Sequence, residues 1–440
     1  MTTIQNALGQ LTAHKGIHRY FFNISWMLGE QVLRILAGLF VGIYVARYLG
    51  PEQFGVYSYA VAFVALFGAI AKLGLDGIVV RDLVNRPDKR DIYLGTAFWL
   101  KLIGALLTLT TLAIAVQFTS NDATTNLYIF IIAGGLIFQS FEVVDFYFQS
   151  KVLSKYVSIA KLIQLALSSV LKLYFIFIQA DLFWFVLVSL IDQITVALSL
   201  VFAYWRQKIG SFFVGFDLGT AKAMVRNSWP LILSGIAGML YMRIDQIMIK
   251  EMLGEREVGL YSAAVRLSEA WYFGPVILTT SLFPAIVSAR KTDQELYNKR
   301  LQRLYTVMVW MAITVALPMT FLSNWVVELL YGVAYREAGP VLMIHIWAGV
   351  FVALGVASSS WLINENLQQI ALYRTLSGAI TNVILNLILI PNYGMIGAAI
   401  GTVISYMVAG FVFDLFSNKT RGMFFMKIDA LILKGIRIGN

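Results

Sequence analysis

The stretch YMRIDQIMIKEMLGEREVGLYSAAV, from Tyr241 to Val265, decides the fold. Its second half repeats an earlier part of the chain, without a gap, at a constant offset of 204 residues. The matching residues are Leu253, Gly254, Gly259, Tyr261, Ser262, Ala264 and Val265 with Leu49, Gly50, Gly55, Tyr57, Ser58, Ala60 and Val61. Because the offset is close to half of the chain, we predict two copies of one ancestral helical unit, with any solute path lying between them.

Composition places this chain in a membrane. Of its 440 residues, 59% are hydrophobic and 13% are charged, whereas a globular domain carries about 25% charged residues. We therefore expect an all-α polytopic membrane protein. The absence of cysteine excludes disulfides, thiolate metal sites and a Cys nucleophile. The net charge of +10 lies on short connections rather than on a water-exposed domain, so no nucleic-acid partner is expected.

Apolar runs predict twelve transmembrane helices, six in each half, because about 20 apolar residues cross the hydrocarbon core. In the first half the spans are 21–46, 54–74, 92–117, 126–148, 157–178 and 183–205. In the second half they are 228–249, 258–288, 304–323, 339–363, 372–390 and 397–417. The long run 258–288 is expected to be tilted, or bent at Pro275 and Pro284.

The connections predict the topology. Lys and Arg gather in alternate connections, together with the N-terminus and the tail, so both termini are expected in the cytoplasm. An even number of spans per half makes the repeat parallel, with a pseudo-two-fold axis along the membrane normal. The predicted domains are an N-terminal lobe (1–210), a cytoplasmic linker (211–226), a C-terminal lobe (227–417) and a cytoplasmic tail (418–440). The tail segment 423–438 fits either a helix on the inner leaflet or a solvated tail.

Seven basic residues remain inside or at the edge of the predicted spans. A cation at mid-depth costs about 2.5–3.5 kcal/mol, so seven facing lipid would cost on the order of 20 kcal/mol. We expect Lys101 and Lys172 to reach the interface from helix ends, and the others to face a wetter environment. The seven residues are Arg34, Lys72, Lys101, Lys161, Lys172, Arg243 and Arg266.

Polar side chains recur at helical spacing on three spans, which predicts a central hydrated cavity of net positive charge. The stripes are Asn23, Trp26, Glu30 and Arg34; Lys161, Gln164, Ser168 and Lys172; and Ser262, Arg266 and Glu269. The alternative is that neighbouring charges on one helix satisfy each other and merely hold helices together. The pairs in question are Glu30 with Arg34, Lys72 with Asp76, and Arg266 with Glu269.

Asp245 is the acidic residue that the sequence singles out. It shares a helix face with Ser234, Gly238 and Tyr241, whereas Arg243 points about 200° away and has to pair elsewhere. A protonatable carboxylate in a cavity is able to couple transport to the entry of H⁺ or Na⁺, and Glu30 and Glu269 are the other candidates. A structural partner for a basic residue of the other half is an equal alternative for Asp245.

No motif for an enzyme or a nucleotide-driven pump occurs. The chain has no Gly-Lys dipeptide and hence no phosphate-binding loop of the Walker type. His14 and His18 are four residues apart but have no carboxylate or Cys partner, so they are a weak metal signal. The predicted outer loops carry no cluster of acids. We expect neither catalysis nor a metal or organic cofactor.

Several stretches resemble the polysaccharide-biosynthesis flippases, the Wzx-type exporters of O-antigen and related repeat units. They are ARYLGPEQFGVYSYA (46–60), DFYFQSKVLSKY (145–156), RIDQIMIKEMLG (243–254), SLFPAI (281–286) and TNVILNLILIPNYGMIGAAIGT (381–402). In the last stretch Asn382 and Asn386 share a helix face ahead of a Pro-Asn-Tyr-Gly turn. These exporters belong to the multidrug, oligosaccharidyl-lipid and polysaccharide exporter superfamily, and the resemblance covers nearly the whole chain.

The resemblance implies a MATE-like fold of two six-helix lobes in the bacterial inner membrane. The implied activity is transfer of an undecaprenyl-pyrophosphate-linked oligosaccharide from the cytoplasmic to the periplasmic leaflet by alternating access. Glycosyltransferases and a polysaccharide polymerase are implied partners, and membrane lipid surrounds the polyprenyl tail. A pyrophosphate head group needs cations along its path, which agrees with the cavity prediction. The intramembrane basic residues expected to meet the substrate are Arg34, Lys72, Lys161, Lys172, Arg243 and Arg266.

Two other functions are weighed against this one. A multidrug antiporter of the MATE type exports organic cations, and its cavity should be lined mainly by acids and aromatics. A non-transporting membrane scaffold for polysaccharide enzymes is the other alternative, which translocation by purified protein in liposomes would exclude. The richness in Lys and Arg within the spans favours the flippase.

Overall fold

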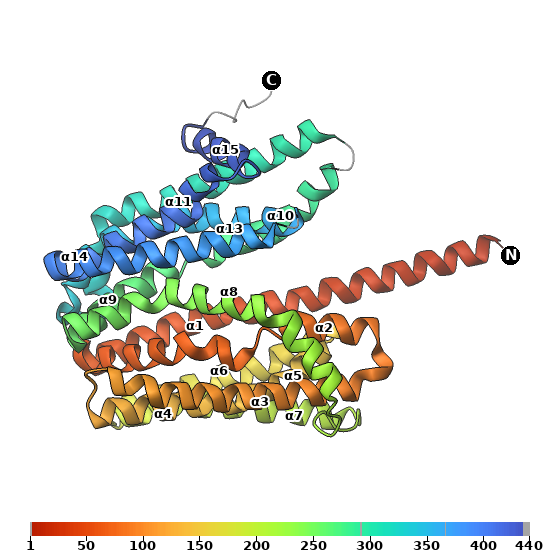
Figure 1. Ribbon diagram of the computed structural model, residues 1–440, viewed down its shortest axis with the longest axis horizontal. Helices are drawn as coiled ribbons and strands as arrows, with labels where there is room; N and C mark the ends of the chain where they lie inside the picture. Colours follow the sequence, from red (N-terminus) through yellow and green to blue (C-terminus); the bar gives the residue numbers. More distant parts are fainter. Residues whose placement is uncertain (1, 291–292, 366, 434–440) are drawn as a thin grey trace. The chain divides into compact units, whose positions relative to one another are not determined.

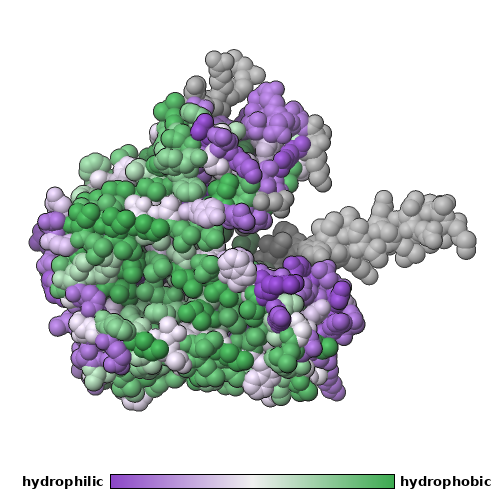
Figure 2. Space-filling view, viewed as in Figure 1, coloured by the Kyte–Doolittle hydropathy of each residue, from purple (hydrophilic) through white to green (hydrophobic). Residues whose placement is uncertain are grey.

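The computed structural model describes residues 2–290, 293–365 and 367–433, with side chains from Ser25 onward except that of Pro284. All regular secondary structure in these ranges is helical. Ten of the described segments are long and apolar enough to cross a membrane. Hydrophobic residues cover most of the face that Figure 2 shows, as expected for helices surrounded by lipid. The predicted all-α polytopic fold is confirmed.

The helices are labelled in chain order (Figure 1). The first seven are α1 (Thr2–Lys72), α2 (Asp76–Asn85), α3 (Arg90–Ala115), α4 (Ala123–Phe138), α5 (Val143–Ser150), α6 (Ser154–Phe177) and α7 (Leu182–Arg206). The next four are α8 (Leu218–Met252), α9 (Glu255–Glu269), α10 (Phe273–Arg290) and α11 (Gln294–Tyr331). The last four are α12 (Ala338–His345), α13 (Ala348–Asn364), α14 (Gln368–Gly410) and α15 (Arg421–Leu431).

The ten candidate segments overlap all twelve predicted spans. α1 is broken at Gly50 (φ 72°) and covers most of the spans 21–46 and 54–74. α14 is broken in the same way at Gly394 (φ 58°) and covers most of the last two spans. Glycine is favoured at both breaks because a side chain is strained at a positive φ.

The run 258–288 is interrupted, but not where the sequence predicted. The interruption lies at residues 270–272, between α9 and α10, and neither proline causes it. Pro275 lies in the first turn of α10, where its missing N–H has no partner to lose. Pro284 lies within helix α10, so the helix is not interrupted at that residue, and the expected bend there stays a prediction.

The two copies of the sequence repeat pack against each other. Gly55 lies against the backbone of Glu255, and an added Cβ at Gly55 would be 1.7 Å from that carbonyl oxygen. The reciprocal contact is equally close: an added Cβ at Gly259 would be 1.8 Å from the carbonyl oxygen of Pro51. Since 51 and 255, like 55 and 259, differ by the repeat offset of 204, the crossing of these helices is itself two-fold symmetric.

The chain forms two compact units that interleave in sequence. Unit 1 comprises residues 1–45 and 67–236, and unit 2 comprises residues 46–66 and 237–440. The cut between the predicted lobes in the linker 211–226 therefore does not coincide with the unit boundaries, because the helix after Gly50 packs with the second half. The contacts Gly55–Glu255 and Pro51–Gly259 assign that helix to unit 2.

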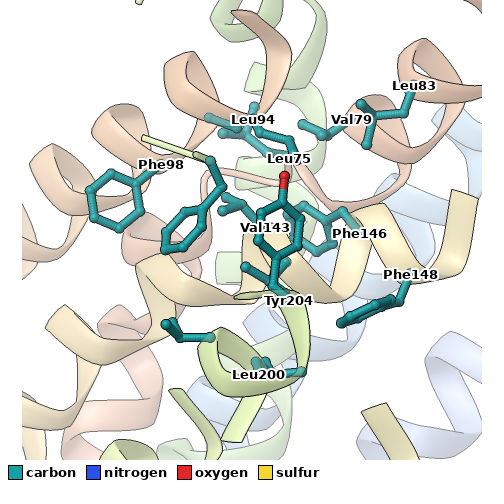
Figure 3. Close-up of a cluster of buried hydrophobic side chains, with 14 of the residues drawn as sticks. Leu75, Val79, Leu83, Leu94, Phe98, Val143, Phe146, Phe148, Leu200 and Tyr204 are labelled. Atoms are coloured by element: carbon teal, nitrogen blue, oxygen red, sulfur yellow. The ribbon is translucent and has the colours of Figure 1, made fainter. Parts of the chain in front are cut away.

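Unit 1 has an aromatic core that α2, α3, α5 and α7 share. Phe148 and Phe212 pack on Tyr204, which is fully buried, and Phe98 packs on Phe212. Figure 3 shows Phe148 beside Tyr204. Leu75 and Val143 complete the cluster from the start of α2 and of α5. These contacts fix the end of α7 relative to α5 and α6 and thereby position the polar residues on α6.

Unit 2 is built around α11, which packs against α10, α13 and α15. The described part of the tail is the helix α15, and its Met423, Lys427 and Ala430 are buried on the protein. Lys427 donates a hydrogen bond to the carbonyl oxygen of Gly410 (2.6 Å) and forms an ion pair with the fully buried Asp414. This buried pair ties α15 to the end of α14; residues 434–440 of the tail lie outside the described residues.

Candidate functional site

Asp245 lies at the centre of a polar cluster inside unit 2. Its carboxylate is 4% exposed and projects from α8, a helix of mostly apolar residues. Oδ2 accepts hydrogen bonds from the hydroxyls of Tyr261 (2.8 Å) and Thr402 (2.6 Å). Oδ1 accepts one from Nδ2 of Asn386 (2.6 Å). All three donors are neutral, so they stabilise the carboxylate but do not compensate its charge.

The break at Gly394 explains how α14 supplies two sides of this cluster. The two arms of α14 run side by side, since an added Cβ at Gly397 would be 2.2 Å from the carbonyl oxygen of Leu389. Asn386 therefore reaches Asp245 from the first arm and Thr402 from the second. Gly401 makes room for the first of these, because a Cβ there would lie 2.8 Å from Oδ1 of Asn386.

Two buried polar atoms near Asp245 have no hydrogen-bond partner among the described residues. Asn386 also donates to Oδ1 of Asn382 (2.9 Å), which is fully buried like Asn386 itself. Nδ2 of Asn382 and Oδ1 of Asn386 are buried without a hydrogen-bond partner among the described residues. A buried, uncompensated carboxylate costs several kcal/mol. The cluster thus offers a carboxylate and neutral oxygens, a donor set that suits a proton or a hard cation.

The basic residues of unit 2 lie on neighbouring helices. Arg243 pairs with Glu269 at 3.7 Å, and their side chains are 30% and 22% exposed. Glu269 thus pairs with Arg243 of another helix rather than with Arg266 at i,i+3. Arg243 was expected to pair away from Asp245, and Glu269 is that partner. Arg266 instead stacks over the ring of Phe54, 5.3 Å from its centroid. The polar contacts of Asp245 described above all lie within unit 2 and are made with neutral side chains.

Two basic residues of α6 in unit 1 form long ion pairs. Lys161 lies 3.8 Å from Asp145 of α5, and Lys172 lies 3.8 Å from Asp192 of α7. Ser168 donates to the same Asp192 (3.0 Å), so the predicted stripe of α6 is satisfied by α7 at this end. Lys161 and Lys172 are 35% and 21% exposed, and each keeps part of its surface free.

The remaining charged residues of unit 1 fall into two groups. Arg34 and Glu30 form the i,i+4 pair at 3.1 Å that was the alternative to a cavity-facing role, and Lys72 is exposed while Asp76 lies 3.9 Å from Lys101. Lys101 is 1% exposed and forms a short ion pair with Glu142 (2.9 Å). It does not snorkel to the interface, contrary to expectation, because Glu142 compensates its charge inside unit 1. The side chains of Asn23, His14 and His18 lie outside the described residues.

Comparison with known proteins identifies the family. The family model described as "Polysaccharide biosynthesis protein" matches residues 22–290, more than half of the chain. The chain belongs to the polysaccharide biosynthesis protein family. The resemblance read from the sequence motifs is thereby confirmed.

Relatives of this polysaccharide biosynthesis protein come from archaea and bacteria. It is 23% identical to a probable low-salt glycan biosynthesis flippase, Agl15, of Haloferax volcanii, over 92% of this chain and 86% of the relative. It is 22% identical to the capsular polysaccharide biosynthesis protein CapF of Staphylococcus aureus, over 88% and 96%. It is also 22% identical to the lipopolysaccharide biosynthesis protein WzxC of Escherichia coli, over 75% and 67%.

Solved structures show the same fold at low identity. An inward-facing multidrug resistance MATE transporter of the MOP superfamily has a TM-score of 0.69 at 18% identity, over 92% of this chain and 96% of that chain. The lipid II flippase MurJ, in an inward closed conformation, has a TM-score of 0.69 at 14% identity, over 93% and 91%. The fold of this polysaccharide biosynthesis protein is therefore MATE-like.

Sequence reasoning found only part of the cluster in this family member. It singled out Asp245, and it noted that Asn382 and Asn386 share a face, but it did not bring them together. It missed Tyr261 and Thr402. Tyr261 carried a signal, because it belongs to the repeated motif. Thr402 ends the stretch 381–402 that resembles the family, but nothing in its spacing indicated that it contacts Asp245.

Proposed function

We propose that this polysaccharide biosynthesis protein is a flippase for a polyprenyl-pyrophosphate-linked oligosaccharide, such as the repeat unit of O-antigen or another surface polysaccharide. In this proposal the protein lies in a bacterial inner membrane with both termini in the cytoplasm. The two lobes alternate between access from the cytoplasmic and the periplasmic leaflet. The names of the relatives Agl15, CapF and WzxC support the substrate class. Polymerase and glycosyltransferases are the proposed partners.

The observation that carries the proposal is the state of the basic residues inside the spans. Lys161, Lys172 and Arg243 hold their carboxylate partners only at 3.7–3.8 Å and stay 21–35% exposed, unlike the buried Lys101. A doubly charged pyrophosphate is a stronger and bidentate acceptor than one distant carboxylate, so it is able to replace these contacts. We propose that these residues, with Arg34, Lys72 and Arg266, line the cationic path of the head group.

The cationic path is tested by replacing Arg34, Lys161, Lys172 and Arg266 together with Gln. We expect loss of surface polysaccharide in cells that depend on this variant, because the head group no longer meets positive charge. A matched control replaces four exposed basic residues, Lys208, Lys222, Arg226 and Arg303, with Gln, and should leave the polysaccharide unchanged. Normal polysaccharide with the first variant, at normal expression, would show that the cationic path is wrong.

The same cells distinguish the flippase from the MATE-type antiporter. Overexpression that raises resistance to cationic drugs, without any effect of gene deletion on polysaccharide, would favour the antiporter. Purified protein in liposomes that moves a lipid-linked oligosaccharide between leaflets excludes the non-transporting scaffold.

We also propose that Asp245 couples transport to a cation gradient. Its carboxylate has three neutral donors and no cationic partner among the described residues, so binding of H⁺ or Na⁺ would neutralise it. Glu30 and Glu269, the other candidates, are each within 4 Å of an arginine and are less in need of a cation. Binding at Asp245 would favour the state of unit 2 in which α8, α9 and α14 are held together.

Asp245→Asn tests the coupling, since it keeps the shape and removes the charge. In liposomes with an imposed Na⁺ or pH gradient, we expect the wild type to accelerate transport and the variant to lose that acceleration. Asp88→Asn, at an exposed position, is the control and should respond like the wild type. If Asp245→Asn still responds to the gradient, coupling lies elsewhere, while the flippase proposal is judged by transport without a gradient.

A further inference from the structure

A groove on unit 1 combines an apolar wall with a positively charged end. It lies between α6 and α7 and has a volume of about 710 Å³. Its apolar wall is formed by Ile159 and Ile163 of α6 and by Leu198 and Phe202 of α7. Lys155 and Arg206 lie at one end, where α6 begins and α7 ends. The ion pairs and the candidate cluster described above do not use these two residues.

The sequence builds this groove with the same pattern on both helices. Lys155, Ile159 and Ile163 follow each other at four-residue steps, and so do Leu198, Phe202 and Arg206. Residues four apart lie on one face of a helix, so each helix presents two large apolar residues and one cation in a row, with the cation first on α6 and last on α7. Since α6 and α7 are antiparallel neighbours joined by a short turn, the two cations meet at the same end.

Small side chains form the floor of the groove, and the aromatic core of unit 1 packs against one of its walls. Ala160 of α6 and Ser199 and Ala203 of α7 line the groove between the large residues. Tyr156 stacks on Phe148 of the core, with ring centroids 5.2 Å apart and planes 25° from parallel. Phe148 in turn contacts Tyr204 (Figure 3). The groove is therefore preformed and does not depend on a mobile side chain at this wall.

The charged end lacks an anionic partner in the described part of the chain. Neither Lys155 nor Arg206 forms an ion pair there, and the Nζ of Lys155 lies over the ring of Trp26, 5.6 Å from its centroid. Gln207 lines the same end, and its buried Nε2 has no hydrogen-bond acceptor among the described residues. Lys155 also lies in the first turn of α6, where the helix dipole favours an anion. Two cationic side chains and the N-terminus of α6 thus lie at the same end of the groove, with no carboxylate partner among the described residues.

Length decides what kind of anion fits. From residue 155 to residue 163 the groove follows α6 for about 12 Å. This length is close to the depth of one leaflet, about 15 Å, and much shorter than a full membrane. Leu198 and Phe202 are both 65% exposed, so the groove is open along its side and a chain can enter laterally. Basic pockets between membrane helices at one interface are suited to phosphate head groups.

We propose that this groove binds an anionic phospholipid of the surrounding leaflet, with its phosphate at Lys155 and Arg206 and one acyl chain along Ile159, Ile163, Leu198 and Phe202. With the topology expected from the Lys and Arg distribution, this is the cytoplasmic leaflet. The lipid is a resident ligand and not the transported substrate. It would fasten α6 to α7 next to Lys161 and Lys172, so activity should depend on the anionic lipid content of the membrane.

The test compares lipid retention by purified protein in native mass spectrometry. Wild-type protein incubated with phosphatidylglycerol should retain it at least tenfold better than phosphatidylcholine, which has no net charge. Lys155→Gln with Arg206→Gln should weaken phosphatidylglycerol binding about 25-fold, from roughly fivefold for each lost charge near the surface. Ser199→Phe keeps both charges but fills the floor, and should weaken binding of both lipids.

The matched control is Lys222→Gln with Arg226→Gln, which removes two exposed cations of unit 1 outside the groove and should leave retention unchanged. If the wild-type protein retains phosphatidylglycerol and phosphatidylcholine equally well, this result alone overturns the proposal. Equal loss in the control pair overturns it as well, since the effect would be one of net charge. Displacement of phosphatidylglycerol by an equimolar amount of undecaprenyl phosphate would assign the groove to the substrate lipid and also overturn it.

Discussion

Replacing Gly55 or Gly259 with Ala should destabilise the protein through one helix crossing. The added methyl group at either position would lie within 1.8 Å of a carbonyl oxygen, where about 3.4 Å is needed for ordinary contact. The obstructing atom belongs to the backbone and not to the tip of a flexible side chain. The two helices therefore have to move apart by roughly 1 Å or more to restore van der Waals contact.

The magnitude follows from two opposing effects. Ala is favoured over Gly within a helix by about 1 kcal/mol. Overpacking costs about 1–3 kcal/mol and more where backbone opposes it, and separating α9 from the helix after Gly50 also loses contacts along the crossing. We expect a net loss of about 2 kcal/mol in the free energy of unfolding for each variant. For a unit of this size that lowers the melting temperature by about 4–8 °C.

Thermal unfolding in detergent, followed by the loss of the monodisperse peak in size-exclusion chromatography, measures this effect. Gly68→Ala is the matched control, because Gly68 lies on the same stretch of α1 as Gly55 and has open space around it. The double variant should lose less than the sum of the single variants, since one methyl group already opens the shared crossing. Equal melting temperatures for Gly259→Ala and Gly68→Ala, or strict additivity in the double variant, would refute the reasoning.

Three further outcomes are expected. Lys427→Met should lower the free energy of unfolding by about 3 kcal/mol because it leaves the buried Asp414 with only Arg374 at 3.9 Å, and Lys427→Met with Asp414→Leu should recover only part of the loss because the buried Arg374 then lacks its carboxylate; melting curves in detergent measure both. Burial, together with the nearby charge of Arg374, lowers the pKa of Lys427 from 10.5 to about 7 in the folded protein. Between about pH 7 and pH 10 the unfolded chain therefore binds more protons than the folded protein. The melting temperature should therefore rise with pH from about 7 towards 10 in the wild type more than in Lys427→Met, and equal pH profiles would contradict this. Gly401→Ala should displace Asn386 from Asp245 and reduce the gradient response in liposomes at least tenfold with normal expression, and an unchanged response would detach Asn386 from coupling.

The spans were predictable from the sequence because crossing a membrane needs only length and apolarity. The breaks at Gly50 and Gly394 separate spans that the hydropathy pattern had already separated, so tertiary structure did not override the local signal there. The bend between α9 and α10 was placed incorrectly, because a proline in the first turn of a helix, such as Pro275, is compatible with helical structure.

Contacts between helices were the part that spacing could not supply. The i,i+4 pair Glu30–Arg34, weighed from the sequence as the alternative to a cavity, is present because it depends on one helix alone. Glu269 pairs with Arg243 of another helix, and Lys101 pairs with Glu142, which is 41 residues away. The same limitation hid Thr402 from the Asp245 cluster. Helical periodicity identifies a face, but only packing identifies what that face meets.

The segment 46–66, which includes the break at Gly50, is synthesised with the first half of the chain, but its partners lie in the second half. Tyr59 reaches Glu251, 192 residues later, and the carbonyl oxygen of Ala46 accepts from Tyr335, 289 residues later. While the ribosome is still making the intervening spans, this segment enters the bilayer without these neighbours. If the chain were cut in the linker after α7, the second fragment would lack the segment 46–66 of unit 2. The two fragments could then assemble only if this segment of the first fragment packed against the second.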